Sequence, residues 1–452
     1  MISSPSSRIN YVCLAAAIGG LLFGFDTAVI SGAINLIKSQ FSLNSTWEGW
    51  LVSSGLVGCI IGVMITGFLC DRIGRKKTMI IAGIMFFISG LGCAFAPSMT
   101  LLIISRMIGG IGVGMASVVS PMYITEFSPA EKRGRMVAYY QLAITIGILL
   151  AYFSNALIVS VKGSQWFFMK EIWRPMFFAM TLPSIAFIIM LIKIPESPRW
   201  LVAAKKNEEA KVVLNTIRTP EAAAKELRDI TEASLKDNLV KISLFSKELR
   251  LPMIIGVVLA ILQQFCGINA IIYYGPKIFE TAGIASNNAI IFQVIIGTVN
   301  LLFTFVAIRW ADKYGRKFLL VSGLSGIILS LILCGILFYT NSPHNIILLI
   351  LIIIFIACFA FSLGPVTWIL INEIFPTEVR AKAVSVCTLA LWIAVWMVGQ
   401  FFPFLLEHAG PAITFWVFAG FSIINLFFSL NVVKETKGKT LEEMQEVFIA
   451  PH

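Results

Sequence analysis

Twelve apolar runs, each long enough to cross a bilayer as a helix, constrain this chain more than any other feature. A helix needs about 20 predominantly apolar residues to span the hydrocarbon core. Because no water bonds the backbone there, only helices and closed barrels can cross it. The predicted spans are residues 11–36, 49–70, 78–96, 100–122, 136–158, 174–194, 252–280, 289–309, 318–339, 345–371, 383–406 and 412–433. The sequence therefore predicts an all-α membrane protein with twelve transmembrane helices.

The composition agrees with this class of protein. Hydrophobic residues make up 58% of the chain and charged residues 13%, whereas soluble domains are about 25% charged. The net charge of +11 does not indicate a nucleic-acid partner, because the basic residues fall in loops between the spans. Eight cysteines stand singly in apolar runs without CxxC or His-rich spacing, so we expect buried thiols and no disulfide, metal site or cofactor.

Lys and Arg are distributed unequally between the two sides of the predicted bundle. Most of the 35 lie in the termini or in the loops after even-numbered spans. Because cytoplasmic loops carry the excess of positive charge, both termini are expected to be cytoplasmic. Residues 195–250 interrupt the apolar pattern with amphipathic runs at 200–217 and 221–235, which predict a small cytoplasmic bundle of linker helices.

Two charged motifs occur twice, in the same order. Asp-x-x-Gly-Arg-Lys stands at 71–76 after the second span and at 312–317 after the eighth. A second motif begins at Glu126 after the fourth span and at Glu373 after the tenth. Such repeats predict two six-helix bundles with a site between them. The predicted domains are residues 1–194, 195–250 and 251–452, the last with a cytoplasmic tail.

One predicted span contains polar residues that apolar packing does not explain. Within 263–276 the chain carries two adjacent amides, then Asn269, two tyrosines, two glycines and a proline. An unpaired amide in hydrocarbon costs several kcal/mol, so these side chains are expected to face protein or a water-filled cavity. Gly and Pro weaken the helix where its backbone lines such a cavity. The alternative is that these residues only join neighbouring helices by hydrogen bonds.

Together these motifs give the chain a resemblance to the sugar porter family of the major facilitator superfamily, over nearly its whole length. Bacterial sugar–proton symporters of the xylose, galactose and glucose type are the members it resembles most. Lys434 stands where the family usually has proline. The motifs that carry the resemblance are the paired DxxGRK loops, Pro121-Met-Tyr-Ile-Thr-Glu126, Glu131-Lys-Arg-Gly-Arg135, Pro195-Glu-Ser-Pro-Arg199, QQFCGIN at 263–269, Gly364-Pro-Val-Thr-Trp368 and Glu435-Thr-Lys-Gly-Lys-Thr440.

Sugar recognition needs planar amides for paired hydroxyl groups and aromatic faces for the C–H side of the ring. The polar span supplies some candidates and the resemblance adds the others. The expected substrate-binding residues are Gln141, Gln263, Gln264, Asn269, Tyr273, Asn300, Trp368 and Trp392, with Phe23 and Phe359 as apolar walls. Each buried Trp can instead be simple packing. Leu391, Val395 and Ile148 stand where relatives carry polar residues, so xylose is not assumed to be the substrate.

An acid and an arginine fall inside predicted spans. Asp26 lies well inside the first span and Arg106 inside the fourth. A charge at mid-membrane costs about 3 kcal/mol on insertion scales, so such residues are usually paired or functional. In the family that the chain resembles, proton-coupled members have Asp at this place and passive members commonly have Asn. The resemblance implies that Asp26 carries the proton with Arg106 as its partner; a static ion pair is the alternative.

Matched acids and bases at the cytoplasmic ends of the spans predict a conformational latch. Ion pairs between the two halves would close the cytoplasmic side and break on inward opening. Positive-inside topology alone explains the bases but not the matched acids. The latch residues are Asp71, Arg72, Arg75, Glu126, Arg133, Glu196, Arg199, Asp312, Arg316, Glu373 and Arg380.

The whole pattern predicts a monosaccharide transporter that works by alternating access as a proton symporter, with a passive facilitator as the alternative. Its expected partners are a hexose or pentose, a proton and the lipid bilayer. We expect a monomer in the plasma membrane, here a bacterial inner membrane. An enzyme is not expected, because His344, His408 and His452 form no catalytic constellation. Asn44 begins a glycosylation sequon, whose use depends on the source.

Overall fold

The computed structural model is built from helices. It describes residues 5–129, 133–161, 171–237, 246, 249–340, 345–375 and 377–437, and within these ranges it contains no strand. The helices are α1 (Pro5–Phe41), α2 (Ser45–Ile73), α3 (Arg75–Ala94), α4 (Met99–Phe127), α5 (Arg133–Ser160), α6 (Trp173–Phe178), α7 (Thr181–Ile192), α8 (Pro198–Ala203), α9 (Asn207–Ile217), α10 (Pro220–Asp237), α11 (Arg250–Phe265), α12 (Ile268–Thr281), α13 (Ser286–Tyr314), α14 (Arg316–Tyr339), α15 (Asn345–Phe361), α16 (Leu363–Glu373), α17 (Thr377–His408) and α18 (Gly410–Asn431).

Twelve segments of the described chain are long and apolar enough to cross a membrane, which confirms the predicted twelve transmembrane spans. Three of these spans consist of two helices each: α6 with α7, α11 with α12, and α15 with α16. Between α11 and α12 stands Gly267 with φ +90°, a left-handed conformation that favours glycine. Between α15 and α16 stands Ser362, and the proline at position 365 then lacks the N–H that a continuous helix would need.

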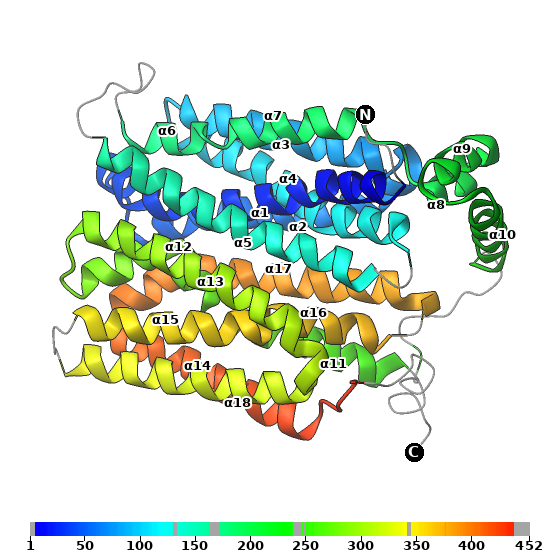
Figure 1. Ribbon diagram of the computed structural model, residues 1–452. Helices are drawn as coiled ribbons and strands as arrows, with labels where there is room; N and C mark the ends of the chain where they lie inside the picture. Colours follow the sequence, from blue (N-terminus) through cyan, green and yellow to red (C-terminus); the bar gives the residue numbers. More distant parts are fainter. Residues whose placement is uncertain are drawn as a thin grey trace.

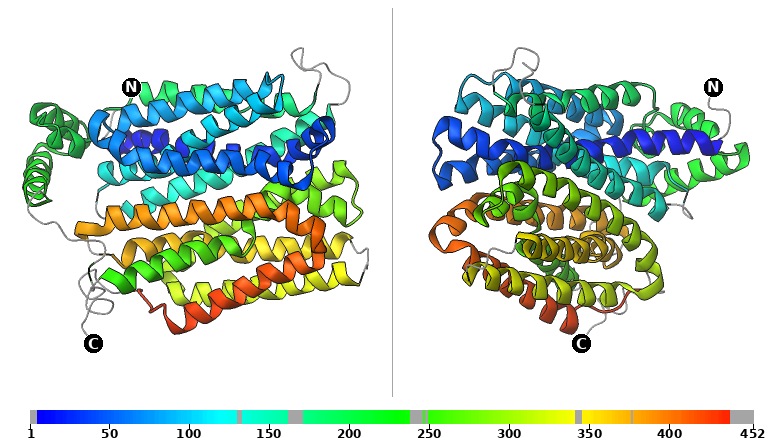
Figure 2. Two further views of the ribbon diagram at one scale, coloured as in Figure 1. Left: turned by 180° about the vertical axis from the view of Figure 1, so that it is seen from behind. Right: turned by 60° about the vertical axis from the view of Figure 1, so that its left-hand side comes forward.

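The helices lie in two groups, seen as upper and lower layers in Figure 1. Helices α1–α7 form the first half and α11–α18 form the second half. Figure 2 shows the same two groups in two further views. Helices α8–α10 stand at one end of the bundle, the end where α1 begins and α18 finishes. We call this end the linker face and the opposite end the far face.

Within the first half, α1 and α5 pack closely because glycines face each other. A Cβ on Gly24 would overlap the carbonyl oxygen of Ile144, and a Cβ on Gly147 would overlap that of Leu21. Small residues let the backbones of membrane helices approach each other in this way. Between the halves, contact runs along α2 with α17, α5 with α13, and α1 with α12.

The linker helices α8–α10 pack on one another and on the linker face of the first half. Leu214 and Ile217 of α9 are buried, as expected for the apolar side of an amphipathic helix. Arg218 pairs with Glu226 of α10 at 2.7 Å and donates to the backbone oxygen of Phe127, at the end of α4, at 3.2 Å. One arginine therefore joins the linker to the membrane bundle.

Candidate functional site

The polar stretch predicted at 263–276 falls on the break between α11 and α12. Besides its left-handed φ, Gly267 has no room for a side chain, because a Cβ there would lie 2.7 Å from the ring of Phe418. The break leaves the end of α11 and the start of α12 without a continuous helical ladder. Polar side chains stand on both sides of the break.

Three amides at this break form a string of hydrogen bonds. Gln263 Nε2 donates to the backbone oxygen of Leu363, at the start of α16, at 2.7 Å. Gln264 Nε2 donates to Gln263 Oε1 at 3.1 Å. Asn269 Nδ2 donates to Gln264 Oε1 at 2.6 Å. The string therefore ties both segments of the α11–α12 break to the first turn of α16.

Two of the predicted aromatic residues meet across the two halves. Phe23 of α1 and Trp392 of α17 have ring centroids 5.4 Å apart at an angle of 41°. Trp392 is buried and Phe23 is half-buried. Aromatic pairs at this spacing attract each other beyond simple burial. These rings give the boundary between the halves an aromatic wall.

The other predicted substrate-binding residues lie on several different helices. Within the described chain, no hydrogen bond or ring contact joins them directly to the amide string. Tyr273 is buried beside Tyr274, with ring centroids 6.4 Å apart. Asn300 is buried, whereas Gln141, Phe359 and Trp368 are half-buried. Their helices are α5 (Gln141), α12 (Tyr273), α13 (Asn300), α15 (Phe359) and α16 (Trp368).

The acid and the arginine predicted inside the bundle lie together. Arg106 Nη1 of α4 donates to Asp26 Oδ1 of α1 at 3.4 Å, and both residues are buried. The guanidinium lies 5.8 Å from the ring centre of Phe177, and its Nε has no hydrogen-bond partner among the described residues. A buried ion pair is stable only when its geometry is excellent and its remaining donors are satisfied. This pair has one hydrogen bond, which is long, and one guanidinium donor that is not satisfied among the described residues.

On the linker face of the first half, four side chains build a compact charged cluster. Arg75, at the start of α3, pairs with Glu126 of α4 at 3.1 Å. Glu196 Oε1 accepts from the backbone N–H groups of Arg75 at 3.0 Å and Lys76 at 3.1 Å. Ser197 Oγ donates to Glu126. Glu196 thus caps the N-terminus of α3, where unpaired N–H groups favour a carboxylate.

The second half repeats this cluster with its own residues. Arg316, at the start of α14, pairs with Glu373 of α16 at 2.9 Å. Glu435 accepts from the backbone N–H groups of Arg316 at 2.9 Å and Lys317 at 3.0 Å. Thr436 Oγ1 donates to Glu373 Oε2 at 2.6 Å. Glu435, Thr436 and Ser197 were missed as site residues, although all three stand in motifs that the sequence displays.

The two capping carboxylates differ in the direction in which their pKa is shifted. Burial raises the pKa of Glu196, and the N–H groups of Arg75, Lys76 and Ser197 only partly oppose this. At Glu435 burial also pushes upward, but four backbone N–H bonds outweigh it and leave the pKa below its ordinary value. The second-half cap is therefore the more firmly ionised of the two.

Other members of the predicted latch lie around the first cluster. Asp71 has a side chain that is 84% exposed and lies 3.8 Å from Arg75. Arg72 stacks over an aromatic ring of α2, and Arg199 of α8 is exposed. These three residues meet water more than they meet the opposite half.

The latch was predicted to join the two halves, but the pairs that the structure describes at this face stay within one half each. Arg75 pairs with Glu126 and Arg316 with Glu373. Arg380 donates to the backbone oxygen of Phe375 at 3.1 Å, near the start of its own α17. The side chains of Arg133 and Asp312 lie outside the part of the chain that the structure describes.

Contacts that cross between the halves occur at the far face, where none was predicted. Asn35 Nδ2 of α1 donates to Glu280 Oε2 of α12 at 2.6 Å. Ser53 Oγ of α2 donates to Gln400 Oε1 of α17 at 2.5 Å. These residues stand within or at the ends of the predicted spans, and nothing in their spacing indicates a partner more than 240 positions away. The far face is therefore closed in this structure.

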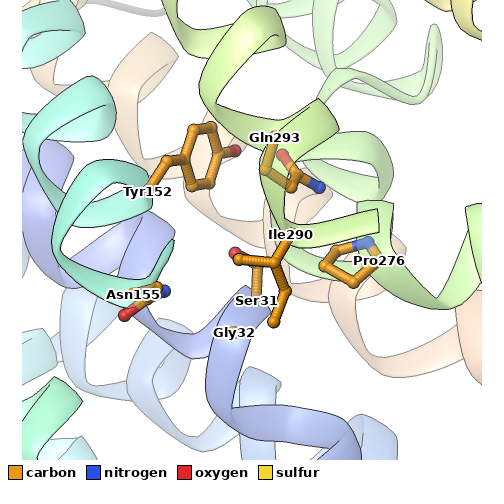
Figure 3. A pocket seen from close by; sticks show the side chains of 7 residues that line it. All are labelled: Ser31, Gly32, Tyr152, Asn155, Pro276, Ile290 and Gln293. Carbon is orange, nitrogen blue, oxygen red and sulfur yellow. The ribbon is translucent and has the colours of Figure 1, made fainter. Parts of the chain in front are cut away.

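A tyrosine closes the same face by bonding a carbonyl that a proline has freed. In an α-helix the carbonyl of residue i accepts from the N–H of residue i+4. Pro276 has no N–H, so the carbonyl of Ile272 has no such partner in α12. Tyr152 of α5 donates its hydroxyl to that oxygen at 3.1 Å. Figure 3 shows Tyr152 facing α12 and α13 across a narrow crevice lined by Ser31, Gly32, Tyr152, Asn155, Pro276, Ile290 and Gln293.

A second tyrosine repeats the device within the second half. Pro403 lies inside α17 and frees the carbonyl of Gly399. Tyr274 of α12 donates to this oxygen at 2.6 Å. Helix α12 is therefore fixed on one side to the first half and on the other to α17.

Replacing Tyr152 with Phe is expected to favour separation of the halves at the far face. The ring stays, but the Ile272 carbonyl loses its donor, and a buried unpaired carbonyl costs about 1–3 kcal/mol. The fraction of molecules whose halves are separated at the far face, which we call the far-open population, should rise roughly tenfold. Spin labels at two exposed far-face positions, Thr100 of α4 and Ser286 of α13, would report the distance between the halves.

Tyr140→Phe is the matched control for this prediction. Tyr140 lies on the same helix and donates to the backbone oxygen of Ala116 at 3.2 Å, inside the first half. The control should leave the label distance unchanged. Equal effects of the two substitutions would show that the Tyr152 bond has no special role between the halves.

Comparison with known proteins supports one class of molecule. The family model described as "Sugar (and other) transporter" matches residues 12–448. The arabinose-proton symporter of Bacillus subtilis is 41% identical over 448 residues, covering 98% of this chain and 96% of the relative. The D-xylose-proton symporter of Escherichia coli is 37% identical over 477 residues, with the same coverage. The inward-open structure of the Escherichia coli xylose transporter XylE superposes with a TM-score of 0.85 at 35% identity, covering 97% of this chain and 100% of that one.

Proposed function

The chain belongs to the sugar transporter family of the major facilitator superfamily, and from this premise we propose that it carries a monosaccharide together with a proton across the membrane by alternating access. It is a multi-pass membrane protein and a transporter rather than an enzyme. Symporters of arabinose and of xylose are among its relatives. The observation that carries the proton-coupled proposal is the buried pair of Asp26 and Arg106.

In this proposal Asp26 takes up a proton on one side of the membrane and releases it on the other. When Asp26 is ionised, the Coulomb attraction of Arg106 holds it. When Asp26 is neutral, that attraction is lost and the two helices that carry the pair are free to shift. The single bond of 3.4 Å and the unsatisfied Arg106 Nε support such a change of partners.

The sugar site in this proposal lies between residues 1–194 and 251–452, taken as two domains joined by the linker domain 195–250. The amide string at the α11–α12 break offers donors and acceptors for paired hydroxyl groups. The Phe23–Trp392 wall offers aromatic faces from both halves. Gln141, Tyr273, Asn300, Phe359 and Trp368 complete the proposed lining of the site.

We further propose that the linker face is cytoplasmic and that the protein acts as a monomer in a bacterial inner membrane. The excess of Lys and Arg in the linker and at this end supports the orientation. The structure, closed at the far face, then represents an inward-facing state. The latch residues would exchange their partners within each half for partners across the halves when this face closes.

Replacing Glu373 with Ala is expected to shift the transporter toward inward-open states. In the proposed latch the substitution removes an acid that holds the cytoplasmic side closed, whereas Arg316 and Thr436, the partners of Glu373 here, belong to its own half. Thiol labelling of a cavity cysteine from the cytoplasmic side should increase several-fold. Unchanged labelling would mean that these charges serve topology alone.

Uptake into proteoliposomes tests the proposed function directly. Purified protein would be reconstituted and assayed with radiolabelled hexoses, pentoses and polyols, with and without an imposed proton gradient. Accumulation of one sugar above its outside concentration, only with the gradient, is the expected result. Equilibration without accumulation would replace symport with passive facilitation by the same fold.

A further inference from the structure

A buried carboxylate at the far face binds two lysines from different halves. Glu48, in the first turn of α2, is completely buried. Lys277 Nζ of α12 lies 2.6 Å from its Oε1 and 2.7 Å from its Oε2. Lys38 Nζ of α1 lies 2.8 Å from its Oε2. Lys277 belongs to the second half, whereas Lys38 and Glu48 belong to the first.

The second lysine is not needed to neutralise the carboxylate in this state. Lys277 alone reaches both oxygens of Glu48, whereas Lys38 reaches only one, has a side chain that is 35% exposed, and is also attracted by Glu407 of α17. Burying an ion costs free energy that its partners must offset, and Lys277 already provides this for Glu48. The second lysine has a use if the cluster exists in two states with different partners.

The chain connectivity decides which pair survives when the halves separate. Lys38 and Glu48 are ten positions apart, on either side of the turn between α1 and α2, and they move together. The Lys277–Glu48 pair spans the boundary and must break. Opening the far face therefore removes Lys277 but leaves the carboxylate with Lys38.

A similar replacement is available to Lys277 on its own helix. In the closed state Glu280 accepts from Asn35 of the first half at 2.6 Å, and this bond also crosses the boundary. Glu280 stands three positions after Lys277 on α12, a spacing at which helical side chains are neighbours. Separation of the halves thus releases an acid and a base beside each other.

We propose that Glu48 and Lys277 form the ion pair that closes the far face, and that Lys38 is the partner that holds Glu48 when this face opens. The proposal rests on alternating access as the proposed mechanism. Exchange of partners, rather than exposure of unpaired charges, keeps both states accessible. Glu48 and Lys277 position the halves and do not touch the proposed sugar site.

The two lysines are then expected to act in opposite directions. Lys277→Met removes an interaction made only in the closed state, so the far-open population should rise roughly tenfold or more. Lys38→Met leaves Glu48 with Lys277 in the closed state but with no lysine in the open state. The far-open population should therefore fall in this variant, although the substitution is chemically the same.

Distance measurement between spin labels at Thr100 and Ser286 in the full-length protein tests the proposal. We expect the label distance to be longer in Lys277→Met than in the wild type. We expect it to be shorter in Lys38→Met than in the wild type. Shifts in the same direction, or no shift in either variant, would overturn it. Glu48→Gln provides the same far-open readout if Lys277→Met fails to fold.

This readout is independent of transport. The distances report the position of the halves even if no sugar is accumulated. Failure of symport in proteoliposomes would therefore leave the gate proposal testable, and unshifted distances would leave the transport assay unaffected.

Discussion

Replacing Asp26 with Asn is expected to abolish concentrative sugar uptake while sugar binding and exchange persist. Asn keeps the shape and a hydrogen-bonding group for Arg106 but cannot cycle a proton. Each proton moved down 100 mV supplies about 2.3 kcal/mol, enough for roughly fiftyfold accumulation. The variant should therefore lose that accumulation and sugar-induced alkalinisation of the medium. Uptake and counterflow into proteoliposomes under an imposed gradient would measure both.

Glu208→Gln is a suitable control, because it replaces an exposed acid of α9 away from the membrane spans. The control should accumulate sugar normally. If Asp26→Asn accumulates sugar as well as the wild type does, the proton is carried elsewhere and the role proposed for Asp26 is wrong.

Replacing Gln264 with Ala is expected to weaken sugar binding roughly ten- to hundredfold. Gln264 is the middle of the amide string, donating to Gln263 and accepting from Asn269. Its loss removes a buried polar partner for the substrate and leaves both neighbours incompletely bonded, at about 1–3 kcal/mol for each missing bond. Calorimetric binding to purified, monodisperse protein would measure the effect.

Asn425→Ala provides the matched control for this second experiment. Asn425 is a buried amide of α18, in the same half, and accepts from Ser429 rather than from the amide string. It should leave affinity unchanged even if it lowers stability. An unchanged affinity in Gln264→Ala itself would exclude α11 from the sugar site.

The spans were predictable from the sequence because bilayer thickness and hydropathy alone fix them. The break at Gly267 also had a local signal, since glycine and proline stand among polar residues. The bond from Gln263 to Leu363 had none, because the two residues are 100 positions apart. Hydropathy says that a buried amide needs a partner, but it does not identify that partner.

The far-face gate was missed for a related reason. Glu48 and Lys277 each stand near the end of an apolar run, where a single charge normally marks the membrane surface. Only the packing of α1, α2 and α12 converts these flanking charges into an ion pair in which the carboxylate is buried. By contrast, Glu435 and Thr436 stood in a motif already noted, and comparing the two repeats would have assigned them.

The bond from Tyr152 to the Ile272 carbonyl has a consequence for how this gate can evolve. Its acceptor is backbone, so any side chain at position 272 that packs there preserves the bond. The vulnerable position is four residues later, where a residue with an N–H in place of Pro276 would occupy the carbonyl within its own helix. Selection that preserves this hydrogen bond should therefore act on Tyr152 and Pro276. Position 272, whose backbone oxygen accepts the bond, can vary among apolar residues.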